Sequence, residues 1–118
     1  MHELAVTESV LRIALDAAEK NDAARVTDIY LTIGRLSSIV DDSVQFYWDH
    51  ISKETICAGA TLHFNRPPAV LHCLDCGQDY VMEDFLEPCP NCGSVNIRVI
   101  SGEELQVDHI DIQRKEEQ

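Results

Sequence analysis

The sequence predicts an α+β fold: two helices packed on a three-stranded sheet, with an inserted zinc-ribbon-like domain that carries a four-cysteine site. Three observations support this prediction. Two helical patterns and two strand patterns come before residue 66, two CxxC pairs follow, and one more alternating strand comes after them. That last strand needs a sheet, because a single strand is not stable alone, and the sheet of the first two strands is its simplest partner.

The length of the chain limits the number of domains, and its net charge limits the kinds of partner it can bind. With 118 residues, the chain has room for one compact domain, or for one small domain and a metal module. The net charge of −12 disfavours nucleic acid and anionic membranes as partners. No apolar run approaches the roughly 18 residues of a membrane span, and the chain does not begin with a basic and apolar signal sequence. These features predict a soluble, cytoplasmic protein.

The first helical pattern runs from about Leu4 to Lys20. Charged residues recur on one stripe of this helix at i, i+4 spacing, with ion pairs available along it. The stripe contains Glu8, Arg12, Asp16, Glu19 and Lys20. The predicted core face contains Leu4, Val10, Leu11, Ile13, Ala14, Leu15 and Ala18. Asn21-Asp22 supplies the turn that ends the helix.

Two strands and a second helix follow. Residues Arg25–Gly34 alternate between apolar and polar, which predicts a half-buried strand that closes at its glycine. Asp41 or Asp42 then has the chemistry of a helix N-cap. The apolar face of this second helix contains Val44, Tyr47, Trp48 and Ile51. Ala60–Asn65 reads as a short second strand.

Arg66-Pro67-Pro68 marks a domain boundary, since proline cannot donate to a β-ladder. Beyond the cysteines, residues 95–99 alternate as a strand, and a final strand begins near Glu104. Its apolar pattern shifts by one residue at Asp108-His109, which predicts a β-bulge. The predicted division is an outer domain of residues 1–68 and 101–113, an inserted metal domain of residues 69–100, and a disordered tail of residues 114–118.

The cysteines provide the most specific motif. They form two pairs, Cys73-Leu-Asp-Cys76 and Cys89-Pro-Asn-Cys92, each followed by a glycine and separated by twelve residues. Each pair predicts a tight knuckle, and two facing knuckles place four thiolates at the corners of a tetrahedron, the geometry of structural Zn²⁺. Four sulfurs leave no open coordination position, so zinc here would hold the fold and would not catalyse a reaction.

Two other readings of this module are weaker. Zinc ribbons that bind nucleic acid need a basic surface, but between Val70 and Ile100 the only basic residue is Arg98. The acidic residues there are Asp75, Asp79, Glu83, Asp84 and Glu87. The knuckles are also similar to those of rubredoxin, an iron electron carrier, but the gap between them is much shorter here.

The N-terminus is a second candidate metal site. In Met1-His2-Glu3 the amine, two backbone nitrogens and the imidazole Nδ1 lie within a few bonds of one another. A deprotonated His2 amide closes one chelate ring with its own imidazole and another with a neighbouring backbone nitrogen. Such planar nitrogen donors suit Ni²⁺ or Cu²⁺ and leave the fourth position exchangeable. A histidine at position two is, however, most often only a polar terminal residue.

The remaining candidates point to structural roles. Cys57 is predicted to be a buried thiol, and His72, next to Cys73, a bystander to a complete set of four ligands. His50, His63 and His109 are expected at the surface. The sequence offers no nucleophile with a base, no phosphate-binding glycine loop and no paired carboxylates with a recognisable spacing. These features predict a protein that is not an enzyme.

These residues together resemble the HypA/HybF family of nickel metallochaperones in [NiFe]-hydrogenase maturation. The resemblance rests on Met1-His2-Glu3 leading into a helix, a strand ending Ile33-Gly34, and the late CxxC…CPxCG module with one returning strand. It covers the chain to about Ile112. It implies a nickel domain of two helices and a three-stranded sheet, with an inserted zinc domain.

The resemblance also implies roles for particular residues. His2 would bind Ni²⁺ through its side chain and backbone, and Glu3 through its backbone nitrogen. The four paired cysteines would bind zinc. Partners implied are a HypB-type GTPase and the large subunit of [NiFe]-hydrogenase, and some family members also serve urease. One departure is Val40, which stands where many relatives have an acidic residue.

The function predicted is therefore a nickel metallochaperone, which carries transferable Ni²⁺ at its N-terminus and structural Zn²⁺ in the cysteine module. The alternative is a zinc-ribbon adaptor that only joins proteins and carries no transferable metal.

Overall fold

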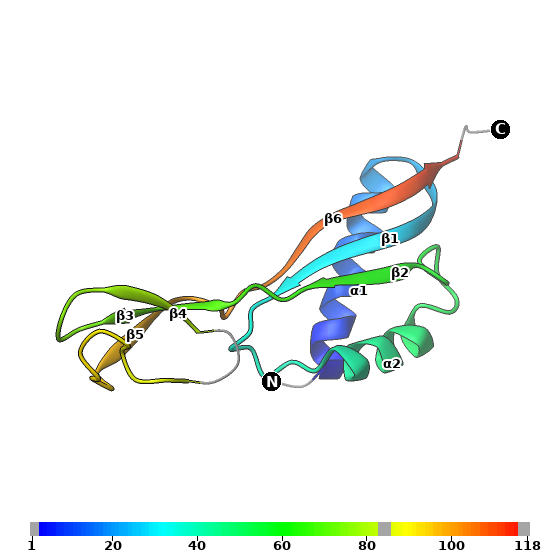
Figure 1. Cartoon of the computed structure of the whole chain (residues 1–118). Coiled ribbons are helices and arrows are strands. Elements are labelled where there is room, and N and C mark those ends of the chain that lie inside the picture. The colour runs from blue at the N-terminus through cyan, green and yellow to red at the C-terminus, as the bar shows by residue number, and fades with distance from the viewer. Residues whose placement is uncertain (1–2, 83–85, 116–118) are drawn as a thin grey trace. The chain divides into compact units, whose positions relative to one another are not determined.

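The computed structural model describes residues 3–82 and 86–115 (Figure 1). In chain order the elements are α1 (Glu3–Lys20), β1 (Ala23–Ile33), α2 (Asp41–Ile51), β2 (Thr61–Asn65), β3 (Ala69–Cys73), β4 (Asp79–Met82), β5 (Ile97–Ser101) and β6 (Leu105–Arg114). Some residues named in the predictions lie outside the described ranges, namely Met1, His2, Glu83, Asp84 and residues 116–118. None of the described helices is long and apolar enough to cross a membrane.

The chain divides into two compact units. Unit 1 contains residues 1–31, 38–64 and 106–118, and unit 2 contains residues 32–37 and 65–105. Unit 2 therefore holds the whole of the predicted metal domain and also short segments on either side of it.

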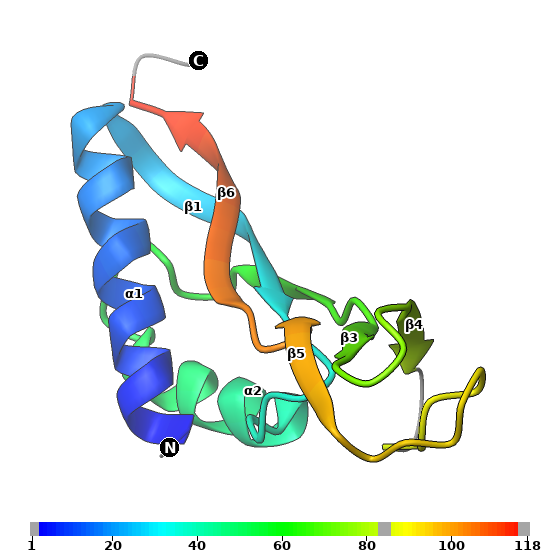
Figure 2. The same cartoon turned by 90° about the vertical axis from the view of Figure 1, so that its left-hand side faces the viewer.

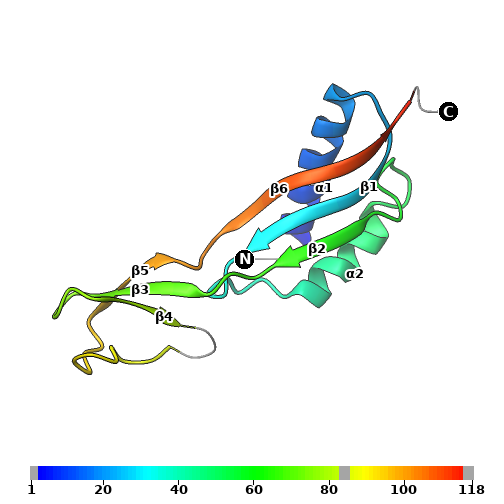
Figure 3. The ribbon, with the colours of Figure 1, turned by 45° about the horizontal axis from the view of Figure 1, so that its top comes forward.

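One three-stranded sheet has the strand order β2-β1-β6, so the first strand is central and the last strand of the chain returns beside it. Both helices lie on one face of this sheet (Figure 2 and Figure 3). The predicted alternation in β1 holds in part: Ile29, Leu31 and Ile33 are buried as expected, but Val26 and Thr32, in the opposite phase, are buried as well. The α+β architecture predicted from the returning strand is thus confirmed.

The buried face of α1 differs from the predicted one. The helix buries Val6, Thr7, Val10, Ala14 and Ala18. Leu4 and Ile13, expected in the core, are 40% and 47% exposed. The small Ala14 and Ala18 therefore lie on the buried face of the helix, while the longer Leu11 and Leu15 lie at its flank and are half-buried. At its C-terminal end Asp22 has a left-handed φ of 54°, which confirms the predicted turn.

The predicted cap of α2 is wrong. Val40, in an extended conformation, is the N-cap residue and makes no side-chain cap hydrogen bond, while Asp41 and Asp42 lie within the first helical turn. The position still suits their charge, because the positive end of the helix dipole stabilises carboxylates there. The Val40 backbone N–H instead donates to Glu3 Oε2 of α1, at 3.2 Å.

Unit 2 contains a second three-stranded sheet, with the order β4-β3-β5 and both pairs antiparallel. The sequence prediction missed β3 and β4. A signal for β3 was present, because Ala69, Leu71 and Cys73 alternate with two more exposed residues. A small core formed by Ala69, Leu71 and Met82 joins the two strands. Such a core is too small to stabilise a domain alone, so a metal cross-link is physically reasonable here.

Candidate metal centre

The two cysteine knuckles have the same backbone design. The Gly77 N–H donates to the Cys73 carbonyl at 2.9 Å, and the Gly93 N–H donates to the Cys89 carbonyl at 2.7 Å. Both glycines are left-handed, with φ of 80° and 76°. Other residues are strained in that conformation, so glycine after each CxxC pair allows the chain to close the turn and point both sulfurs the same way.

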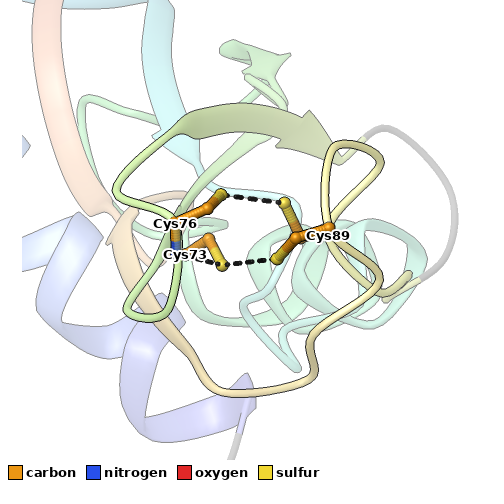
Figure 4. A group of neighbouring side chains, drawn as sticks. Cys73, Cys76 and Cys89 are labelled. Carbon is orange, nitrogen blue, oxygen red and sulfur yellow. Dashed lines mark hydrogen bonds between the residues drawn. The ribbon is translucent and has the colours of Figure 1, made fainter.

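The four paired cysteines converge on one point. The Sγ atoms of Cys73 and Cys92 are 3.5 Å apart and those of Cys76 and Cys89 are 3.6 Å apart. All four sulfurs lie within 4.8 Å of one another. Figure 4 shows Cys73 and Cys76 facing Cys89 across the site. Within residues 3–82 and 86–115 no other group of three or more histidine, cysteine or acidic side chains converges in this way.

These distances fit Zn²⁺. A tetrahedron with Zn–S bonds of about 2.3 Å has sulfur–sulfur edges of about 3.8 Å. The sulfurs are too far apart for disulfides, whose S–S bond is about 2.05 Å, and all five cysteines are free. A free thiol set of this size is typical of a reducing compartment or a metal site.

The ionisation of the cluster also favours a cation. The Asn91 side chain and the Gln78 backbone lower the pKa of the Cys76 thiol to about 6. The backbone N–H of Ser94 lowers the pKa of Cys92, but hydrogen bonds with neighbouring cysteine side chains and desolvation outweigh it and raise that pKa to about 12. Four sulfurs so close together therefore resist complete ionisation unless a positive charge compensates them, which Zn²⁺ supplies.

Asp75 links the two knuckles from inside the first CxxC pair. Its carboxylate accepts a short hydrogen bond from Ser94 Oγ and a second from Asn96 Nδ2 at 3.3 Å. The Ser94 hydroxyl oxygen also accepts from the Asn96 backbone N–H at 3.0 Å. These hydrogen bonds, led by the one from Ser94, lower the pKa of Asp75 and keep it ionised near neutral pH. Asp75 therefore connects the loop of the first CxxC pair to the segment that follows the second pair, and so helps to hold the four sulfurs close together.

Replacing Asp75 with alanine is expected to weaken zinc binding about tenfold or more, because outer contacts that orient metal ligands have effects of this size. The measurement is competition for zinc with a chromophoric chelator. Asp79→Ala serves as the matched control, since Asp79 pairs with His72 and does not join the knuckles. Equal losses of zinc affinity in both variants would show that Asp75 acts only through charge or general stability.

The other predicted candidates have structural partners. His72 Nδ1 lies 2.6 Å from Asp79 Oδ1, across the β3–β4 pair, and His72 is not part of the sulfur cluster. Successive residues of a strand point to opposite faces, which separates His72 from Cys73. Cys57 is fully buried, as predicted, and burial raises the pKa of its thiol.

Two of the three histidines predicted at the surface belong to a ring stack on the sheet of unit 1. Tyr30 of β1 stacks between His63 and His109, with ring centroids 4.3 Å and 4.0 Å away. His63 Nε2 also lies 2.9 Å from Asp28 Oδ2. Sequence alternation alone places these side chains on one face but does not show which strands are neighbours, so the stack was not predicted.

Glu3 is the described residue of the predicted nickel site, and its side chain is already engaged. Glu3 Oε2 accepts the hydrogen bond from the Val40 N–H, and the Glu3 carbonyl accepts one from Thr7 Oγ1 at 2.6 Å. The start of α1 is therefore attached to the start of α2. This long-range contact could not be found in the sequence, because Val40 shows no capping pattern.

Comparison with known proteins identifies relatives along the whole chain. A family model described as "Hydrogenase/urease nickel incorporation, metallochaperone, hypA" matches residues 1–112. The hydrogenase maturation factor HypA of Geobacter metallireducens is 35% identical over 113 residues, covering 96% of this chain and 100% of that protein. The hydrogenase maturation factor HybF of Klebsiella pneumoniae is 33% identical over 111 residues, covering 94% and 98%.

A solved structure has the same fold. The solution structure of the Ni metallochaperone HypA from Helicobacter pylori matches with a TM-score of 0.69 and covers 98% of this chain and 100% of that chain. The two sequences are 22% identical, so this comparison supports the architecture and not particular residues.

Proposed function

Because the chain belongs to the HypA family of nickel-incorporation metallochaperones in hydrogenase maturation, we propose that it binds Ni²⁺ at its own N-terminus and delivers it to the [NiFe]-hydrogenase large subunit. Under this proposal His2 supplies its imidazole and backbone nitrogen, and Glu3 supplies its backbone nitrogen. Ligand exchange at the remaining position lets nickel leave for the next protein.

The observation that carries this proposal is the hydrogen bond between Glu3 Oε2 and the Val40 N–H. Since it holds the carboxylate of Glu3, that residue is left to act through its backbone, as a planar nitrogen site requires. The bond also holds the first turn of α1 beside the start of α2, where Asp41 and Asp42 lie. We propose these two carboxylates as candidates for the fourth, exchangeable nickel ligand.

The zinc site has a separate role in this proposal. Cys73, Cys76, Cys89 and Cys92 hold Zn²⁺ permanently and stabilise the predicted metal domain of residues 69–100. The sulfur geometry supports this role, because a closed set of four thiolates leaves no position for exchange. The zinc site therefore stabilises this domain and takes no part in the transfer of nickel.

We further propose that the protein works in the cytoplasm with a HypB-type GTPase. Free cysteines agree with a reducing compartment. The family description names both hydrogenase and urease, so urease maturation proteins are further proposed partners, and urease activity in cells is the readout for them.

Replacing His2 with alanine is expected to abolish Ni²⁺ binding and hydrogenase maturation while zinc stays bound, because the chelate loses its side-chain nitrogen. A residue added before Met1 tests which backbone nitrogen completes the chelate. Nickel binding is expected to persist, because His2 and Glu3 supply the three nitrogens, and a loss of binding would assign the place of the Glu3 nitrogen to the Met1 amine. Calorimetric titration of Ni²⁺ into zinc-loaded protein measures binding, and hydrogenase activity in cells measures maturation.

The matched control is His50→Ala, which removes an exposed histidine from α2. Nickel binding and maturation should both survive that change. If they also survive His2→Ala, the zinc-ribbon adaptor without transferable metal becomes the better description.

A further inference from the structure

A long groove follows α1 on the surface of unit 1. One hollow of about 320 Å³ lies between the middle of α1 and Ile51 at the end of α2. A second, of about 550 Å³, lies between the last turn of α1, the start of β1 and residues 54–56. Leu15 lines both, so the two hollows adjoin along the helix, and together they are called the α1 groove.

The floor of the α1 groove is apolar. It contains Leu11, Leu15, Ile51 and Ile56. The two leucines are one helical turn apart and half-buried, because the alanines of α1 and not the leucines lie on its buried face. Ile56 is 38% exposed. These side chains therefore keep apolar surface that the fold of unit 1 does not cover.

The rim of the α1 groove is mainly acidic. Its carboxylates are Glu8, Asp16, Glu19 and Glu54, and its bases are Arg12 and Lys115. The sequence placed ion pairs along this stripe of α1, but none of these four carboxylates pairs with a base or accepts a hydrogen bond within residues 3–82 and 86–115. The rim therefore keeps an uncompensated negative charge around an apolar floor.

We propose that the α1 groove is a docking site for a basic amphipathic helix of a partner protein. The apolar face of such a helix would cover the leucine and isoleucine floor, and its lysines or arginines would meet the free carboxylates of the rim. None of the residues that line the α1 groove belongs to either metal site, so the proposal does not depend on nickel binding at the N-terminus.

The dimensions agree with this occupant. From Glu8 to Glu19 the groove follows α1 for about 16 Å, or three helical turns, at about 1.5 Å per residue. Three turns accommodate apolar anchors at i, i+4 and i+7, the usual pattern of a helix bound in a groove. The charge also selects the partner, because the chain carries a net −12 and repels acidic helices and anionic membranes.

The test uses the full, zinc-loaded chain and two synthetic helices of about 18 residues. The first has leucine on one face and lysine on the other, and the second has glutamate in place of lysine. In ¹⁵N-resolved NMR titrations the lysine peptide is expected to shift amides of residues 8–19 and 51–56. Its affinity should fall as salt is added, and the glutamate peptide should not bind.

Variants in the rim and floor locate the interaction. Glu19→Lys with Glu54→Lys is expected to weaken binding of the lysine peptide at least tenfold, and Leu15→Ala to weaken it without changing its salt dependence. The control pair, Asp49→Lys with Glu103→Lys, makes the same charge change at exposed acids outside the groove and should weaken binding less than threefold.

Three results would overturn the proposal. One is a loss of peptide binding in the control pair equal to that in the rim pair, which would mean general charge attraction. Another is shifts spread over the whole acidic surface or confined to unit 2. The last is concentration-dependent shifts of groove amides without any peptide, which would assign the groove to a second copy of this chain.

Discussion

A Cys73→Ala variant is expected to lose zinc and, with it, the folded state of unit 2. Cys73 is fully buried at the end of β3 and belongs to the only sulfur cluster among the described residues. Structural zinc contributes about 10–16 kcal/mol in small metal modules, far more than a core of three buried residues can supply. Zinc content by mass spectrometry under native conditions and the dispersion of NMR signals from β3 and β5 measure the two losses.

The matched control is Cys57→Ala, since Cys57 is equally buried but lies in unit 1. This variant should keep one zinc per chain, and its cost should be limited to a small cavity near the thiol. The Trp48 indole signal reports on the core of unit 1 in both variants, because Trp48 is buried in α2. A Cys73→Ala protein that kept its zinc and the signals of β3 would show that the cluster is not the metal site that stabilises unit 2.

Sequence reasoning succeeds where one pattern has one physical solution. The CxxC spacing and the glycine after each pair define a knuckle locally, and the structure brings the four sulfurs together as predicted. The alternation in β1 correctly predicts that Ile29, Leu31 and Ile33 are buried, although Val26 and Thr32 of the other phase are buried too. The returning strand had to pair with a sheet, and β6 lies beside β1.

Sequence reasoning fails where distant residues decide the outcome. Asp41 and Asp42 have good capping chemistry, yet the Val40 N–H at the start of α2 donates its hydrogen bond to the carboxylate of Glu3, which belongs to α1. The apolar residues of α1 are spread widely enough around the helix to allow several buried faces, and the fold buries the alanines and leaves Leu4 and Ile13 exposed. The α1 groove follows from this selection, because the leucines left at the flank form its floor.

A Gly34→Ala variant is expected to lower the stability of unit 2 by about 3 kcal/mol or more, among the larger effects of single substitutions. The sequence identified Gly34 as the end of a strand, but its environment is the reason for the large effect. A Cβ atom there would overlap the carbonyl group of Gly102, and neither backbone can move freely. The Gly34 N–H donates to the Glu104 carbonyl and the Leu36 N–H donates to the Gly102 carbonyl, both at 2.8 Å.

Gly59→Ala separates this steric effect from backbone strain. Gly59 has a left-handed φ of 78°, but a Cβ atom there meets nothing within 4 Å. That variant should therefore cost only about 1–2 kcal/mol, the penalty for an L-residue in the left-handed region. Native-state hydrogen exchange of the β3 amides measures unit 2, and exchange of the α1 amides measures unit 1. If the β3 amides are as well protected from hydrogen exchange in Gly34→Ala as in Gly59→Ala, then the segment around Gly102 moves aside at little cost in free energy. The close approach of these two backbone segments would then not be a fixed part of unit 2.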